Sequence, residues 1–163
     1  MKKAFLIILL LITGLFAVSE GERAPDFTLV SLNTSQQQSL KSFRGKVVLL
    51  NLWASWCKGC KKEMPEFVAL QHSIPKGFRI VAVSLDDDAA QAKRFLDTLS
   101  ARSGNIPFAV LHDSQKKVAK TYDCKAMPSS YLIDKHGIIR KVIIGSLDHH
   151  EMEALKEMIR KLQ

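Results

Sequence analysis

The chain has 163 residues, of which 47% are apolar and 25% are charged. This composition is typical of one soluble globular domain, and it excludes an intrinsically disordered chain. The formal net charge is +8. The basic residues are scattered along the sequence, so we interpret them as a solvated surface that favours anionic partners or lipid headgroups, and we expect no nucleic-acid partner.

The first 19 residues differ in character from the rest. Lys2 and Lys3 precede fifteen uncharged, mostly apolar residues, as in an export signal with a basic start and an apolar core. Ala17 and Ser19 are small residues at the spacing that a signal peptidase accepts. We therefore predict a signal peptide over 1–19, with an N-terminal membrane anchor as the alternative. Either way, residues 20–163 form one extracytoplasmic domain, in the periplasm or tethered to the cytoplasmic membrane.

The first half of this domain is predicted to contain two strands and a helix. A short strand is expected near 27–32, followed by a polar turn. The almost continuous apolar run at 46–54 indicates a strand that is covered on both faces. Helical spacing of apolar residues follows over 58–73, and Pro65 is expected to kink this helix.

The next elements continue the alternation of strands and helices. A buried strand is predicted over 78–85, and then a helix over 86–102 whose first residues are acidic, as suits the helix dipole. A third buried strand follows over 108–113. A short helix over 114–122 is predicted to be capped by Ser114.

The chain is predicted to close with a hairpin and a helix. Two strands, 129–134 and 138–145, are joined by the turn signal at 135–137. The last helix, 147–163, carries one apolar stripe: Met152, Leu155, Ile159 and Leu162. This order of elements predicts an α/β fold in which helices flank a central sheet.

Two cysteines stand close together in "WASWCKGCKKEMP", where the strand at 46–54 ends and a helix begins. The free N–H groups of a helix N-terminus favour an anion, and three nearby lysines add positive charge, a setting in which low-pKa thiols occur. At this spacing the two sulfurs can form a disulfide. We expect Cys57, at the helix end, to be exposed and reactive, and Cys60, one turn further, to be less accessible and to react second.

The residues alone leave three uses for such a pair. A structural zinc site needs four ligands, and the sequence has no second CxxC motif and no histidines at a matching spacing. A purely structural disulfide across so short a loop would restrain the unfolded chain little. Redox chemistry is the favoured interpretation, and we expect no metal and no cofactor.

The stretch "NLWASWCKGCKKEMP" and the later "MPSSYLID" resemble the TlpA/ResA-like thiol-disulfide oxidoreductases, an exported branch of the thioredoxin superfamily. The resemblance covers nearly the whole of 20–163, including an "APDFTL" opening that is shared with the peroxiredoxin-related AhpC/TSA branch. It implies a thioredoxin-like fold, with a central mixed β-sheet flanked by helices, an N-terminal strand extension and a βα insertion over 78–101.

The resemblance also implies roles for both cysteines and for one carboxylate. Cys57 and Cys60 are expected to form the redox-active disulfide of a protein-disulfide reductase. The thiolate of Cys57 attacks the substrate, and Cys60 then resolves the mixed disulfide. Glu63 matches a glutamate with a proton-handling role in ResA-like members. Its i,i+3 spacing also places it on the same helix face as Cys60.

Substrate binding is assigned to Trp56, Met127 and Pro128. In the family, the proline of the second motif is cis and lies against the cysteines, and Pro128 matches it. Trp56 adjoins the reactive cysteine, where it can form part of a docking surface. Cys124 stands where relatives usually have a small apolar residue, and we interpret it as a packed and inert side chain.

Two positions in the predicted site depart from the pattern of thioredoxins. Asn51 stands where cytoplasmic thioredoxins carry a buried aspartate, and asparagine is common in the exported branch. Lys58-Gly59 separates the cysteines, where a proline often appears. The lysine charge favours the reduced thiolate and Glu63 opposes it, so the net effect on the reduction potential stays open.

The expected partners follow from the family. They are protein disulfides, with apocytochrome c and cytochrome c-type biogenesis as the leading substrate hypothesis, and a membrane thiol-disulfide electron donor that re-reduces the pair.

A thiol peroxidase is the alternative enzyme. Peroxiredoxins carry a proline seven residues and a threonine three residues before the reactive cysteine. This chain has Leu50 and Ala54 at those positions, which argues against a peroxidase. A metal-binding module is a weaker alternative, because related copper proteins space their cysteines one residue wider.

Overall fold

The computed structural model describes residues 18–163, so most of the predicted signal peptide lies outside the described residues. The strands are β1 (Thr28–Ser31), β2 (Gln37–Ser39), β3 (Val47–Trp53), β4 (Phe78–Ser84), β5 (Ala109–His112), β6 (Ser129–Ile133) and β7 (Ile139–Ile144). The helices are η1 (Leu40–Phe43, a 3-10 helix), α1 (Lys58–Ser73), α2 (Ala89–Ser103), α3 (Lys117–Thr121) and α4 (His149–Leu162). All predicted strands and helices are present, and β2 and η1 are additional elements within the expected polar turn.

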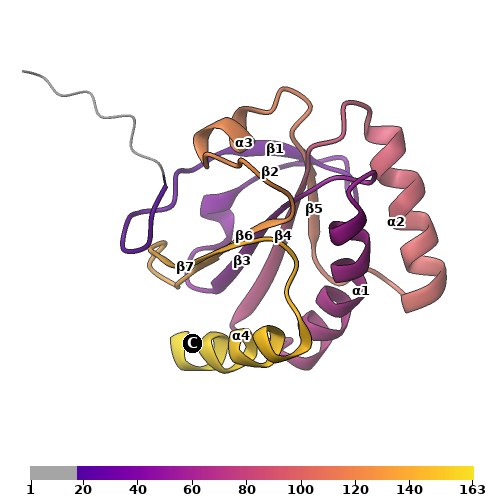
Figure 1. The fold of residues 1–163 in the computed structure, drawn as a ribbon. Helices are drawn as coiled ribbons and strands as arrows, with labels where there is room; N and C mark the ends of the chain where they lie inside the picture. The colour runs from indigo at the N-terminus through magenta and orange to yellow at the C-terminus, as the bar shows by residue number, and fades with distance from the viewer. Residues whose placement is uncertain (1–17) are drawn as a thin grey trace, which may run out of the picture.

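The strands form a single mixed sheet in the order β2-β1-β5-β4-β3-β6-β7. Strands β3, β4 and β5 run parallel, whereas β6 pairs antiparallel with both β3 and β7. Helices α1, α2 and α4 pack on one face of the sheet, and α3 and η1 pack on the other (Figure 1). The predicted α/β architecture with a central mixed sheet is confirmed. No helix within residues 18–163 is long and apolar enough to cross a membrane.

Strand β3 is central to the sheet, and all seven of its residues are buried. Leu49 and Trp53 face the core under α1, α2 and α4. Leu50 and Leu52 face the second core, on the side of α3. The continuous apolar run in the sequence has this cause, because a central strand is covered on both faces. The end of β3 is therefore a rigid base for the cysteine motif that follows.

Helix α1 carries the cysteine motif in its first turn and continues through Pro65. The buried residues of this helix recur at helical spacing and face the sheet: Cys60, Glu63, Met64, Phe67, Val68, Leu70 and Gln71. Burying a large apolar side chain such as Phe67 contributes about 2 kcal/mol or more. This stripe fixes the helix against β3 and carries Glu63 into the interior beside Cys60.

The predicted cap of the short helix α3 is wrong. Ser114 lies before the helix, which begins at Lys117, and the preceding residue Asp113 takes the capping role instead. Its carboxylate accepts bonds of 2.9, 2.8 and 3.1 Å from the N–H groups of Lys117, Val118 and Ala119. A carboxylate offers more acceptor sites than a hydroxyl, so one Asp113 side chain satisfies three donors.

The three acidic residues before α2, at 86–88, have different roles. Asp88 is the N-cap, and its carboxylate accepts a bond of 2.9 Å from Ala90 N–H, as expected of an acidic helix start. Asp87 instead forms an exposed ion pair of 2.9 Å with Lys116. Asp86 is buried and turns towards the cysteine motif. The prediction that the helix includes all three residues is therefore wrong, because α2 begins only at Ala89.

Candidate active site

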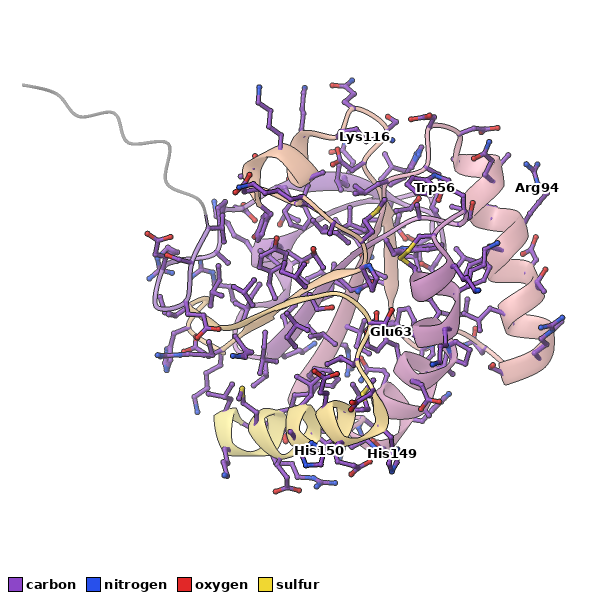
Figure 2. The ribbon with its side chains drawn as sticks, viewed as in Figure 1. Trp56, Glu63, Arg94, Lys116, His149 and His150 are labelled. Atoms are coloured by element: carbon purple, nitrogen blue, oxygen red, sulfur yellow. A yellow bond between two sulfur atoms is a disulfide. The ribbon has the colours of Figure 1, made fainter. Side chains whose placement is uncertain are left out.

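Cys57 and Cys60 are joined by a disulfide at the start of α1, with an S–S distance of 2.20 Å (Figure 2). Cys57 is the N-cap of the helix, and its Sγ accepts a hydrogen bond of 3.2 Å from Cys60 N–H. Cys57 is 7% exposed and Cys60 is 1% exposed. The predicted order of accessibility holds, but the expected exposure of Cys57 is wrong for this oxidised state, in which its sulfur is bonded to a buried partner.

The two tryptophans around the motif have opposite surroundings. Trp53 is fully buried, with its ring 5.4 Å from that of Phe95. Trp56 is 63% exposed and projects from the loop before α1 (Figure 2). An exposed indole next to the disulfide provides an apolar surface that a protein partner can contact.

The loop that leads from β3 to Cys57 is fastened by Asp86. Both carboxylate oxygens accept from Ser55 N–H, at 3.1 and 3.0 Å, and one also accepts from Ser55 Oγ–H at 2.6 Å. Ser84 Oγ–H donates to the other oxygen at 2.8 Å. Asp86 thus fixes the backbone one residue before Trp56 and two before Cys57. Sequence reasoning missed this residue, although the parallel pairing of neighbouring strands brings their carboxyl ends to one edge.

The peptide bond between Met127 and Pro128 is cis, as the family resemblance implies. Pro128 lies against the cysteine turn, because a Cβ placed on Gly59 would be 3.3 Å from Pro128 Cδ. Met127 is partly buried and packs against both cores. The structure therefore brings the second motif of the sequence to the first, at the start of β6.

Glu63 is 4% exposed and lies between α1 and the loop that leads into α4 (Figure 2). Its Oε1 accepts a hydrogen bond of 3.2 Å from Leu147 N–H, and its buried Oε2 has no partner within the described residues. Burial raises the pKa of this carboxyl to about 7, while the Leu147 N–H and, more weakly, the Asn51 amide act to lower it. Glu63 can therefore exchange a proton close to neutral pH.

A cleft of about 260 Å³ gives Glu63 a route to solvent between α1 and the start of α4. Both polar and apolar side chains line it: Lys62, Glu63, Glu66, Ser146, Leu147, Asp148, His149 and Met152. On the opposite side, Asn51 is buried and donates to Ser130 Oγ at 3.0 Å. The carboxyl group therefore has a closed side towards the sheet and an open side towards water.

Cys124 is a free thiol, half-buried against the second core. Its Sγ–H donates to Ala126 C=O at 3.3 Å, and burial raises the pKa of the thiol. It is not bonded to either cysteine of the motif. This placement agrees with a packing role.

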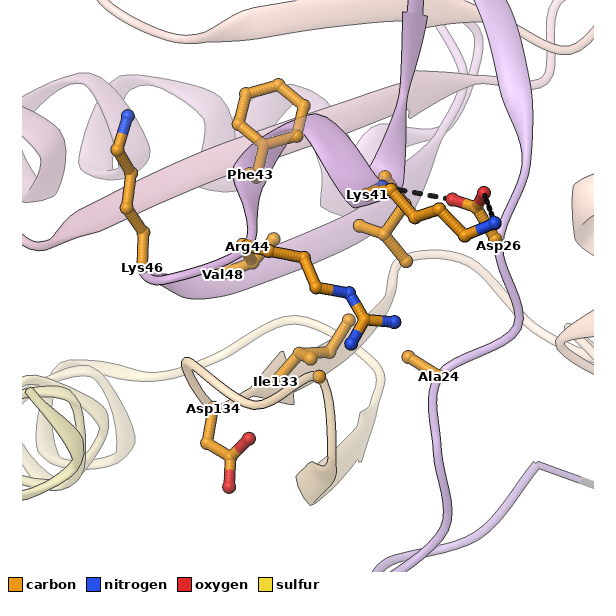
Figure 3. Close-up of a pocket in the computed structure, with 11 residues that line it drawn as sticks. Ala24, Asp26, Lys41, Phe43, Arg44, Lys46, Val48, Ile133 and Asp134 are labelled. Carbon is orange, nitrogen blue, oxygen red and sulfur yellow. Dashed lines mark hydrogen bonds and ion pairs between the residues drawn. The ribbon is translucent and has the colours of Figure 1, made fainter.

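A second, much smaller pocket of about 20 Å³ lies at the opposite end of β3, near Val48 (Figure 3). Its edge carries an ion pair of 3.2 Å between Lys41 and Asp26. Val48 lies five positions before Trp53 on this extended strand, a distance of about 17 Å. This pocket is therefore separate from the disulfide. Within residues 18–163, no group of three or more histidine, cysteine or acidic side chains is placed to hold a metal ion.

Comparison with known proteins matches residues 21–142 to the AhpC/TSA family. The chain belongs to this family. Thiol-disulfide oxidoreductase ResA of Geobacillus kaustophilus is 32% identical over 98% of this chain and 95% of that protein. Thioredoxin-like protein YneN of Bacillus subtilis is 35% identical over 83% of this chain and 78% of that protein.

The solved structures agree on the fold. StoA of Bacillus subtilis superposes with a TM-score of 0.67 at 26% identity, covering 82% of this chain and 95% of that one. A thioredoxin family protein of Chlorobium tepidum superposes with a TM-score of 0.73, covering 88% and 99% of the two chains. The protein has the thioredoxin-like fold and is a thiol-disulfide oxidoreductase, as its resemblance to ResA-like members predicted.

Proposed function

We propose that the protein is an exported reductase of protein disulfides in which Cys57 and Cys60 are the working pair. The observation that carries this proposal is the disulfide at the N-terminus of α1, one turn from a buried carboxyl group. A redox pair needs a stabilised thiolate and a group that can take the second proton. The start of α1 and Glu63 provide these two functions.

In the first step, the thiolate of Cys57 attacks one sulfur of the substrate disulfide. A mixed disulfide forms, and the other substrate sulfur leaves as a thiolate that takes a proton from water. The N–H of Cys60, which is 3.2 Å from Cys57 Sγ in the oxidised protein, stabilises the attacking thiolate in the reduced protein. Trp56, Met127 and Pro128 form the surface on which the substrate lies.

In the second step, Cys60 loses its proton to the Glu63 carboxylate and attacks Cys57 Sγ. The second substrate sulfur is released as a thiolate, so two electrons pass from the protein dithiol to the substrate disulfide. A general base works best when its pKa lies near the working pH, and the pKa of Glu63 is raised to about 7. The cleft beside Glu63 then returns the proton to water.

The cellular setting is also part of the proposal. Residues 1–19 export the domain or hold it at the membrane, a membrane thiol-disulfide protein re-reduces the pair, and apocytochrome c is the leading substrate. Support comes from the basic and apolar N-terminus and from relatives named thiol-disulfide oxidoreductase ResA. Disulfide repair in other exported proteins is the second substrate hypothesis.

The test is to trap partners with single cysteine variants. Cys60→Ser should accumulate mixed disulfides with an oxidised protein substrate, and Cys57→Ser should not. Rapid consumption of hydrogen peroxide by the reduced wild type, together with slow reduction of protein disulfides, would instead identify a thiol peroxidase. If Cys60 is alkylated faster than Cys57 in the reduced protein, the roles of the two thiols are reversed.

A further inference from the structure

The segment that enters the domain runs along the final hairpin, at the end of the sheet away from the disulfide. Gly21 N–H donates to the carbonyl oxygen of Ile139 at 2.8 Å, and Ile139 N–H donates to that of Glu22 at 2.9 Å. The apolar stretch of the N-terminus, 4–18, ends five positions before Arg23. Five residues of chain span at most about 18 Å. Arg23 is therefore held on the hairpin within this distance of the apolar stretch.

Two arginine side chains from different segments meet on the turn of this hairpin. Arg23 and Arg44 each donate from Nη1 to the carbonyl oxygen of His136, at 3.1 and 3.2 Å. A Cβ placed on Gly137 would be 3.5 Å from Arg23 Nη1 and 3.3 Å from Arg44 Nη1, so both groups also lie beside this glycine. Both arginines are exposed. Two positive charges therefore lie side by side at the surface.

Neither guanidinium group forms an ion pair with a carboxylate of residues 18–163. Figure 3 shows the Arg44 side chain between Asp26 and Asp134, without an ion pair to either. The nearby carboxylates have other partners: Asp26 pairs with Lys41, Asp134 with Arg140 and Glu20 with Lys141, and Glu22 accepts from Ser19 N–H. A guanidinium group has five N–H donors, and in the described chain each of these two groups donates one hydrogen bond. The others can bind an anion from solvent.

We propose that Arg23 and Arg44 form a docking site for the phosphate groups of an anionic lipid surface. Adjacent like charges repel each other until an anion neutralises them, and the fork of a guanidinium group matches the oxygens of a phosphate. The apolar stretch that ends close to Arg23 identifies a membrane as the source of these phosphates. The inference rests on the proposed location of the domain at the membrane and on no step of the disulfide exchange.

Docking through this pair leaves the redox site uncovered. The hairpin turn lies near Val48, and Cys57 follows the other end of β3. In Figure 1, the indigo start of the described chain lies on the opposite side of the molecule from α1 and α2. A domain that rests on headgroups through the arginines therefore presents its disulfide and Trp56 away from the membrane. Salt screens such contacts, so docking is reversible and the domain can still turn towards a membrane electron donor.

The test titrates phosphatidylglycerol into the full chain held in dodecyl maltoside micelles, which contain no phosphate. NMR follows the backbone amide signals of Gly137 and its neighbours. At about 50 mM salt the signals should shift to saturation, and at about 0.5 M salt the shift should disappear. The variant with both Arg23→Gln and Arg44→Gln should bind about 25-fold more weakly, which is about fivefold for each charge removed near an anionic surface.

The matched control carries Lys93→Gln and Arg94→Gln. It removes two exposed charges from α2, on the other side of the molecule (Figure 2), and should bind phosphatidylglycerol like the wild type. An equal loss in this control would show attraction by net charge alone and would overturn the docking site. Equal shifts with phosphatidylcholine, or with inorganic phosphate at the same concentration, would also overturn it, because the site would then not select an anionic lipid surface.

Reductase turnover separates this inference from the proposed function. The arginine variant should reduce protein disulfides at the wild-type rate, because neither arginine contacts the cysteine motif. A failed phosphatidylglycerol titration with normal turnover would remove the docking site alone. If Cys60→Ser traps no substrate while phosphatidylglycerol still binds, the proposed reductase activity is wrong and the docking site stands.

Discussion

Two carboxyl groups lie buried near the cysteine motif, and their surroundings differ. Asp86 is fully buried, and both of its oxygens accept hydrogen bonds, from Ser55 and Ser84. Glu63 is nearly as deeply buried, but among residues 18–163 only one of its oxygens accepts a bond, from Leu147 N–H. Burial is therefore common to the two groups, and the number of hydrogen-bond donors that hold each carboxyl group in place is what differs between them.

The contrast predicts that, of these two carboxyl groups, Asp86 contributes more to the stability of the folded protein. Asp86→Ala leaves the Ser55 N–H, the Ser55 hydroxyl and the Ser84 hydroxyl without their acceptor. Each unsatisfied buried donor costs about 1–3 kcal/mol, so the free energy of unfolding should fall by about 3 kcal/mol or more. Urea unfolding followed by circular dichroism measures this change.

Asp87→Ala is the matched control, because it removes the adjacent carboxylate. The Asp87 side chain is 94% exposed, and in the described part of the chain it pairs only with Lys116. An exposed pair of this kind contributes little. Its stability should remain close to that of the wild type. Equal losses in the two variants would show that the hydrogen bonds of Asp86 do not stabilise the loop.

The second prediction concerns the pH dependence of stability in the oxidised protein. The carboxyl pKa of Glu63 is about 7 in the folded chain, against an ordinary value of 4.5. Below pH 4.5 the group is neutral in both states, and stability is lost as the pH rises from there to about 7. Glu63→Gln removes this loss, so its stability relative to the wild type should increase by about 2 kcal/mol between pH 5 and pH 8.

Glu66→Gln, on the exposed side of the same helix, provides the comparison. Its stability should follow that of the wild type over the same pH range, because Glu63 is retained. Glu63→Gln should also slow turnover and lower the apparent pKa of at least one active-site thiol, measured as alkylation rate against pH. Superimposable curves for Glu63→Gln and the wild type, with unchanged turnover, would place Glu63 outside the mechanism.

The sequence predicted one of these carboxylates and not the other, for a physical reason. Glu63 lies one turn after Cys60 on the same helix, so a local spacing rule placed it correctly. Asp86 and Ser55 are 31 residues apart and meet only because β3 and β4 pair in parallel. Neither residue belongs to a local pattern that reports this contact.

The same distinction applies to the rest of the molecule. The buried run of β3, the start of α1 and the final hairpin are local patterns, and the structure confirms them. The meeting of Arg23 and Arg44 on the His136 carbonyl depends on how the N-terminal segment lies along the final hairpin, and no spacing in the sequence encodes it. Cys57 was expected to be exposed because it ends a helix, but its bond to Cys60 draws its sulfur into the core.

The third prediction tests whether Trp56 acts by contacting the substrate rather than by holding the loop before α1 in place. Trp56→Ala leaves the bonds between Asp86 and Ser55 in place and removes an exposed indole, so stability should change by less than about 0.5 kcal/mol. Turnover of an oxidised protein substrate should fall several-fold in kcat/KM, with little change for a small disulfide such as oxidised glutathione. An equal loss for both substrates would show that the indole acts on the thiols rather than on docking.

The smallest effect is expected at Cys124, where burial acts on a thiol instead of a carboxyl group. Burial raises its pKa, but its Sγ–H has a partner in the Ala126 carbonyl and its surroundings are the second core. A shifted pKa that results from packing alone should have no functional consequence. Cys124→Ala removes one half-buried sulfur, so stability should fall by about 1 kcal/mol or less, and disulfide reductase activity should match that of the wild type. Thermal unfolding and a turnover assay measure the two quantities. A disulfide between Cys124 and Cys57 or Cys60 in the isolated protein, seen by mass spectrometry, would instead make Cys124 a third redox thiol.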